Sequence, residues 1–132
     1  MPPQPYKILV VDDDKSFLSV ISEMLSSLKD PVDVQTVRSG IECVQFIKRN
    51  APDLVLLDIG MHHMNGLVTF RFIKSISPST LVYYLSGHSH KDAQNAVGMV
   101  PADGYFSKTH FVELLKTHTS LVSILATGKV EL

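Results

Sequence analysis

The sequence predicts an α/β fold, a doubly wound parallel sheet with helices on both faces. Short apolar runs typical of buried strands alternate with amphipathic helical patterns, which gives five strand–helix units with short connections. The chain of 132 residues fits one domain, and its 45% hydrophobic content supplies a sizeable core. Alternation of this kind joins parallel strands through right-handed crossovers.

The first half of the chain contains three of the expected strands and two helices. Apolar or alternating runs predict strands at residues 7–11, 32–37 and 54–58. Apolar residues at helical spacing from Phe17 to Leu28 predict the first helix, with acids and Ser16 as caps at its start. The capping box Ser39-Gly-Ile-Glu42 predicts the start of the second helix, and Asn50-Ala-Pro52 its end.

The second half continues the same alternation. Strands are expected at residues 80–85 and 105–107, and helices at residues 67–76, 91–99 and 111–125. Asn65 is expected to cap the first of these helices, and Thr127-Gly128 to stop the last. The expected domain spans residues 6–126, between a short tail at residues 1–5 and a C-terminal tail or start of a linker at residues 127–132.

Composition and charge exclude several classes of function. The 12 basic and 13 acidic residues leave a net charge of −1, which argues against a nucleic-acid-binding surface. Cys43 is the only cysteine, so no internal disulfide can form, and a reducing cytosol is the expected compartment. No apolar run approaches the ~18 residues of a membrane span, and residues 1–5 lack the features of a signal peptide. We therefore expect a cytoplasmic protein that contacts neither a membrane nor nucleic acid.

Polar and charged side chains stand where the expected strands end. Asp12 and Asp13 follow the first strand, Asp58 ends the third, and Ser86 and Lys108 follow the fourth and fifth. In a parallel sheet these ends lie at one edge, where open α/β sheets bind their ligands. Clustered carboxylates repel one another, and a hard divalent cation such as Mg²⁺ relieves that repulsion. With one ammonium and one hydroxyl group, such a cluster can hold a phosphoryl group on or near a carboxylate.

Each of these residues also has a purely structural interpretation. An aspartate or serine after a strand commonly caps the next helix. A single lysine is commonly a solvated surface charge. The functional interpretation depends on the joint pattern, because all five groups stand at strand ends that share one edge of the sheet.

Four motifs contain these strand ends: ILVVDDD at residues 8–14, PDLVLLDIGMHHMNG at residues 52–66, YYLSGHS at residues 83–89 and ADGYFSK at residues 102–108. With them, the sequence resembles the receiver domains of two-component response regulators over nearly its whole length. The resemblance implies a flavodoxin-like fold with five helices and a five-stranded sheet of order 2-1-3-4-5. Its switch point would lie between the first and third strands.

The resemblance implies a role for each matching residue. Asp58 is the implied phosphoacceptor, and Asp12 and Asp13 join it in holding Mg²⁺, for which Mn²⁺ can substitute. The backbone carbonyl of Gly60 is a further implied metal ligand. The residues implied to bind the phosphoryl group or to switch with it are Ser86, Gly87, Lys108 and Tyr105. Gly60 and His88 flank the site and are expected to tune the rate of dephosphorylation.

The resemblance also implies partners. A sensor histidine kinase or a histidine phosphotransfer protein would donate the phosphoryl group, and an output partner or missing effector domain would respond to it. A homodimer through the face of the fourth helix, fifth strand and fifth helix is a further expectation. On this interpretation the chain is a signalling domain and not an enzyme, because it shares only in its own phosphoryl transfer and autodephosphorylation.

Two places depart from the family pattern. His62, followed by His63, stands where the loop after the third strand usually carries a proline. Lys108-Thr109 replaces the common Lys-Pro pair. We expect its peptide bond to be trans, because a cis bond without proline costs ~3–4 kcal/mol.

Two other functions stay open. Residues 12–16, DDDKS, loosely fit the D-x-D-x-[ST] motif of haloacid-dehalogenase-like phosphatases, in which Asp12 and not Asp58 would be modified. The absence of a second acidic pair after the fourth strand argues against that function. Alternatively, a receiver-like module could bind partners without phosphorylation, although retention of all five site groups favours the phosphoacceptor.

Overall fold

The computed structural model describes residues 4–60, 66–87 and 102–129, which include a five-stranded sheet. Its strands run parallel in the order β2-β1-β3-β4-β5, which confirms the expected fold class. The strands are β1 (Tyr6–Val11), β2 (Val32–Val37), β3 (Leu54–Asp58), β4 (Leu81–Ser86) and β5 (Gly104–Ser107).

The strand order brings the first two carboxylates together. β1 pairs with both β2 and β3, so the direction of winding reverses between β1 and β3. The register pairs Val11 with Leu57, and Asp12 and Asp58 are the next residues along these two strands. They therefore lie side by side at the carboxyl edge of the sheet, at the reversal point where such sheets bind ligands.

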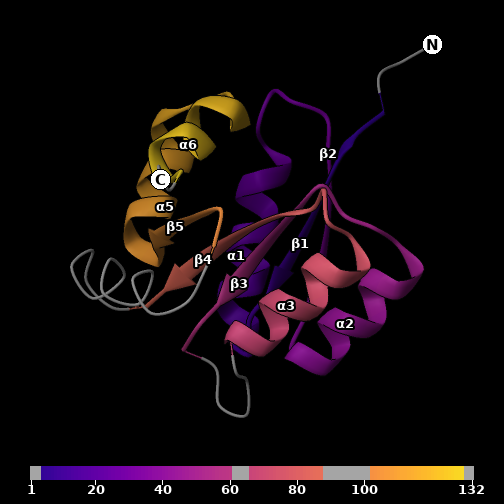
Figure 1. The fold of residues 1–132 in the computed structure, drawn as a ribbon. Helices are drawn as coiled ribbons and strands as arrows, with labels where there is room; N and C mark the ends of the chain where they lie inside the picture. The colour runs from indigo at the N-terminus through magenta and orange to yellow at the C-terminus, as the bar shows by residue number, and fades with distance from the viewer. Residues whose placement is uncertain (1–3, 61–65, 88–101, 130–132) are drawn as a thin grey trace.

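Helices cover both faces of the sheet (Figure 1). The first face carries α1 (Lys15–Ser26), α5 (Lys108–Thr117) and α6 (Leu121–Gly128), and the second carries α2 (Gly40–Arg49) and α3 (Gly66–Ile76). Each face buries its own apolar cluster. Leu54 and Leu56 of β3 belong to the first cluster and Val55 and Leu57 to the second, because successive strand residues point to opposite faces.

Two helix starts agree with the sequence signals. The Asp14 carboxylate accepts the backbone N–H groups of Ser16 and Phe17 at 3.0 and 3.2 Å, so Asp14 caps α1. The Ser39 hydroxyl accepts the Glu42 N–H at 3.1 Å, and the Glu42 carboxylate accepts the Arg38 N–H at 2.7 Å. The predicted capping box is thus confirmed, with its return bond displaced by one residue from Ser39 to Arg38.

The prediction of one continuous helix over residues 111–125 is wrong. α5 ends at Thr117, the backbone at His118 is extended (φ −110°, ψ 146°), and α6 begins at Leu121. The Thr117 hydroxyl and the His118 Nδ1 bond to carbonyls of the preceding turn, which offers the backbone an alternative to the helix. A distant carboxylate then fixes the new helix start, because Asp30 Oδ2 accepts the Leu121 N–H at 2.7 Å.

α6 packs against the edge of the sheet formed by β5. The Tyr83 hydroxyl donates to the Leu125 carbonyl at 3.0 Å, and Lys129 forms an isolated antiparallel bridge with Gly104. Side chains Leu121, Ile124 and Leu125 are buried in the first apolar cluster. The C-terminal residues through Lys129 therefore contact the sheet directly.

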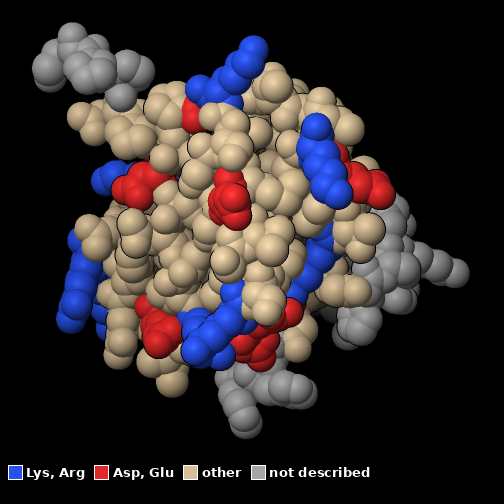
Figure 2. All heavy atoms as spheres, turned by 180° about the vertical axis from the view of Figure 1, so that it is seen from behind, with Lys and Arg blue, Asp and Glu red and all other residues tan. Residues whose placement is uncertain are grey.

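Two expected features of the fold lie outside the described residues, namely the helix at residues 91–99 and the Asn65 cap. No helix in the part of the chain that the structure describes is long and apolar enough to cross a membrane. On the face seen in Figure 2, acidic and basic side chains of the described residues are interspersed, in keeping with the balanced composition.

Candidate functional site

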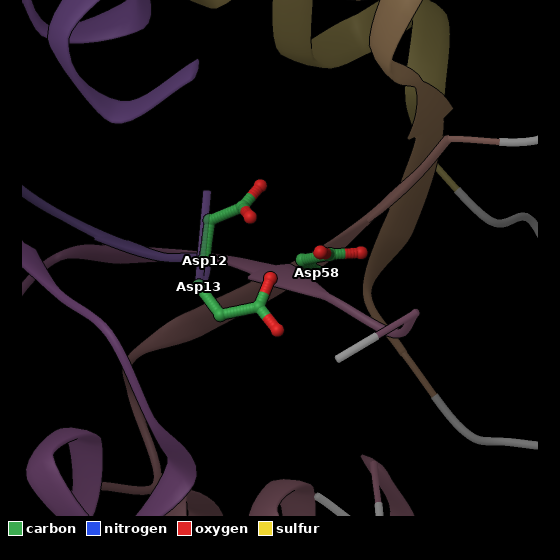
Figure 3. Close-up of side chains that lie close together, drawn as sticks. All are labelled: Asp12, Asp13 and Asp58. Atoms are coloured by element: carbon green, nitrogen blue, oxygen red, sulfur yellow. The ribbon is translucent and has the colours of Figure 1, made fainter. Parts of the chain in front are cut away.

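Three carboxylates converge at the carboxyl edge of the sheet. Asp12 follows β1, Asp13 comes next, and Asp58 is the last residue of β3. Each offers a carboxylate oxygen within 4.8 Å of the other two, and Figure 3 shows the three side chains grouped at the strand ends. Asp12 and Asp58 are buried, whereas Asp13 is exposed to solvent. The sequence prediction that these groups meet at one edge agrees with this geometry.

Lys108 supplies a positive charge to this cluster. It is the first residue of α5, and its Nζ lies 2.6 Å from Asp12 Oδ2 and 3.3 Å from Asp58 Oδ2. Burial by itself lowers the pKa of Lys108, but the hydrogen bond to Asp12 and the charges of Asp58 and Asp12 outweigh it, so this pKa is raised. The ammonium stays protonated and neutralises part of the carboxylate charge.

Asp58 combines burial with several polar contacts. Burial is the largest influence and raises the pKa of Asp58, and the nearby charge of Asp12 acts in the same direction. The Gly60 N–H, which donates to Asp58 Oδ1 at 2.8 Å, and the Lys108 ammonium lower that pKa without cancelling the rise. Ionisation of Asp58 is therefore less favourable than that of a solvent-exposed carboxyl group, and a bound cation would make it more favourable.

The donor set fits Mg²⁺. Asp12 Oδ1 accepts the Asp14 N–H at 2.9 Å, and the buried Oδ2 pairs with the Lys108 ammonium at 2.6 Å. The three clustered carboxylates carry more negative charge than the Lys108 ammonium balances, and such a cluster suits a small, hard cation that prefers oxygen ligands and retains waters. The metal-binding role of the Gly60 carbonyl stays a prediction, since the contacts given by the structure involve its N–H.

Ser86 and Tyr105 lie on the same face of the sheet. The register pairs Tyr84 with Tyr105 and Ser86 with Ser107, so Ser86 and Tyr105 project to one side of adjacent strands. Ser86 is buried at the end of β4, and Tyr105 is partly buried against the apolar cluster under α2 and α3. Gly87 is exposed, and a Cβ atom there would meet no atom of the described residues within 4 Å. The histidines His62, His63 and His88 lie outside the described residues.

Two contacting residues were missed by sequence reasoning. The Phe17 ring centroid lies 4.4 Å from Lys108 Nζ, and the Arg38 guanidinium donates to the Asp13 backbone carbonyl at 3.2 Å. Phe17 had the signature of an inward-facing helical residue, and Arg38 followed a strand next to a capping box. Neither pattern contains a signal that connects the residue with a site assembled from other strands.

Comparisons with known proteins agree with the fold. The family model described as "Response regulator receiver domain" matches residues 8–119. "Response regulator MprA" from Mycobacterium sp. (strain KMS) is 30% identical over 111 residues, which cover 84% of this chain and 47% of that protein. The chain thus spans about half the length of the curated relatives it matches.

Solved structures give the same result. The N-terminal domain of a response regulator/sensory box/GGDEF 3-domain protein from Carboxydothermus hydrogenoformans is 27% identical, with a TM-score of 0.70 over 92% of this chain and 91% of that one. The phosphorylated cyanobacterial phytochrome response regulator RcpA is 26% identical, with a TM-score of 0.69 over 86% of this chain and 91% of that one. The matched motifs, the strand order and these similarities lead to one conclusion: the chain belongs to the response regulator receiver domain family.

Proposed function

We propose that Asp58 accepts a phosphoryl group from a phosphohistidine on a sensor histidine kinase or a histidine phosphotransfer protein. The single observation that carries this proposal is the grouping of three carboxylates within 4.8 Å of one another, with Lys108 in contact with two of them. Membership of the receiver family, whose members are signalling domains, supports it.

The transfer is a displacement at phosphorus. An Asp58 carboxylate oxygen attacks the phosphohistidine phosphorus, an O–P bond forms as the P–N bond breaks, and the imidazole leaves neutral if its other nitrogen carries a proton. The product is an aspartyl phosphate. Lys108 faces Asp58 Oδ2, so its ammonium is placed to pair with the phosphoryl oxygens, and water later hydrolyses the bond.

Asp12, Asp13 and Asp58 are the residues that would hold Mg²⁺, with the Gly60 carbonyl as a further ligand. The metal, when bound, supplies positive charge that stabilises the oxygens of the transferring group. The protein contributes the placement: Asp14 and Gly60 fix the two buried carboxylates through backbone N–H donors at 2.9 and 2.8 Å. Lys108 supplies the remaining cationic charge.

The proposed signal passes from Asp58 to β5. Ser86 hydrogen-bonds a phosphoryl oxygen, and the resulting movement allows Tyr105 to change rotamer on the same face of the sheet. The output partner or effector domain would recognise the altered surface. Because the curated relatives are about twice as long, an output domain elsewhere in the protein is one proposed recipient, and a homodimer through β5 and α5 is another.

The experiment is phosphorylation by acetyl phosphate, followed by intact-mass measurement. Wild type with Mg²⁺ is expected to gain about 80 Da, the mass of one phosphoryl group, and the gain should vanish in EDTA and in Asp58→Asn. Asp33→Asn is the matched control, because Asp33 is an exposed carboxylate on β2 and should be phosphorylated as wild type. A kinase is not needed, so the result tests the receiver chemistry itself.

The alternatives have distinct outcomes. A gain that survives Asp58→Asn but is lost in Asp12→Asn would identify the phosphatase-like chemistry, although Asp12 is fully buried and its carboxylate already contacts Asp14 and Lys108. No gain by a folded wild type would indicate a module that acts by binding alone. Either result would overturn the proposal.

A further inference from the structure

The Lys108 ammonium has a third neighbour besides the two carboxylates. The ring of Phe17, from the first turn of α1, lies with its centroid 4.4 Å from Lys108 Nζ. A cation this close to an aromatic face is attracted to the ring, and attraction at such contacts is electrostatic. The site therefore includes a group from α1 that belongs to none of the strand-end motifs.

Phe17 is itself held in place. Its backbone N–H donates to the Asp14 carboxylate at 3.2 Å, within the cap of α1, and its ring packs against the first apolar cluster. Asp14 in turn donates its N–H to Asp12, so the cap and the acidic pair form one connected structure. The position of the ring is thus set by the same short segment that places Asp12.

Lys108 needs such a restraint. Its side chain retains 20% exposure, and a flexible four-carbon stem allows an ammonium to turn toward water. Asp12 and Asp58 attract it through ion pairs of 2.6 and 3.3 Å. The Phe17 ring, 4.4 Å away, adds a further attraction and covers part of the ammonium with an apolar group, which favours the position beside Asp58 that the proposed transfer needs.

We propose that Phe17 is a positioning residue for phosphoryl transfer, whose ring holds the Lys108 ammonium against Asp12 and Asp58. The inference rests on the proposed function of Asp58 and deepens it. Phe17 acts through Lys108 and does not touch the reacting atoms.

The kinetic test uses acetyl phosphate, so that contacts with a protein donor cannot contribute. Phe17→Leu keeps an apolar side chain but removes the π face, and we expect its maximal phosphorylation rate to fall about two- to fivefold. The Mg²⁺ concentration at half-maximal rate should stay unchanged, because the substitution leaves Asp12, Asp13 and Asp58, the carboxylates that would hold the ion, in place. Phe17→Tyr keeps the ring and should react as wild type does. Val20→Ala, a change at an exposed apolar residue of the same helix, is the matched control.

A measurement without phosphorylation tests the contact itself. Urea unfolding of Phe17→Leu, Lys108→Met and the double variant forms a thermodynamic cycle, from which the coupling of the two side chains follows. We expect coupling of about two- to fivefold in the unfolding equilibrium constant, and none in the parallel cycle of Val20→Ala with Lys108→Met.

The outcomes separate the two proposals. If Phe17 and Lys108 are coupled in unfolding but wild type is not phosphorylated, the proposed function of Asp58 is refuted, and the kinetic role of Phe17 with it. The contact between the Phe17 ring and the Lys108 ammonium would still be supported. If wild type is phosphorylated and both Phe17→Leu and Phe17→Tyr react at the wild-type rate, the positioning role alone is overturned. If both variants lose rate equally, it is also overturned, because the aromatic ring would then not matter.

Discussion

Gly104→Ala should disrupt the contact between α6 and the sheet. A Cβ atom at Gly104 would lie 2.6 Å from the Gly128 carbonyl oxygen and would collide with the Tyr83 ring. The Tyr83 ring cannot swing away easily, because it is buried and its hydroxyl is bonded to the Leu125 carbonyl of α6 at 3.0 Å. The added methyl group must therefore push α6 from β5 or distort the β4–β5 pair.

Overpacking of a closely packed site costs about 1–3 kcal/mol in the free energy of unfolding. For a domain of this size, a loss of that order lowers Tm by about 3–6 °C per kcal/mol. Urea unfolding followed by circular dichroism measures the loss. Gly87→Ala is the matched control, because a Cβ there meets nothing within 4 Å in the part of the chain that the structure describes, and its stability should change by less than about 0.5 kcal/mol.

Gly128→Ala tests the same contact from the side of α6. Its Cβ would lie 2.5 Å from Phe106 Cζ and 2.8 Å from the Tyr105 carbonyl oxygen. We expect a similar loss of stability, and the double variant should lose less than the two single losses added together, because both act on one interface. If Gly104→Ala were as stable as Gly87→Ala, the tight packing of α6 against β5 would be refuted.

Three further predictions concern the site and α6. Burial raises the pKa of Asp58, so the folded protein binds the carboxyl proton more tightly than the unfolded chain does. In EDTA, the free energy of unfolding of wild type relative to Asp58→Asn should therefore fall as the pH rises above about 4, the ordinary carboxyl value. Urea unfolding between about pH 4 and pH 8 measures this difference, and an increase with pH would contradict the prediction. Mg²⁺ at 100 times its Kd should raise the free energy of unfolding by about 2.7 kcal/mol, and Asp13→Ala should weaken that effect, as thermal melts with added Mg²⁺ or EDTA would show. Asp30→Ala removes the carboxylate that caps α6 and should lower the free energy of unfolding, measured in urea, by about 1 kcal/mol. The control is Asp33→Ala, which removes an exposed carboxylate, and an equal loss in both variants would show that the cap contributes nothing.

The sequence alone determined the architecture and the acidic site. Segments with alternating or continuous apolar residues, which indicate strands, are followed by segments with helical apolar spacing. This alternation can be read locally in the sequence, and it is typical of a parallel sheet. Because parallel strands end at one edge, the positions of Asp12, Asp58 and Lys108 at strand ends were enough to predict their grouping. Local caps such as Ser39 with Glu42 were equally readable, because both partners lie within one turn.

The tertiary structure decided which distant side chains meet. The apolar spacing of residues 111–125 continues across His118, so periodicity could not reveal the break between α5 and α6. The Asp30 carboxylate that caps α6 comes from the loop before β2, and no local pattern encodes that contact. Likewise, the approach of Phe17 to Lys108 depends on the packing of α1 beside the start of α5. Such contacts depend on side-chain direction and on the relative placement of whole elements, which are fixed only when the core packs.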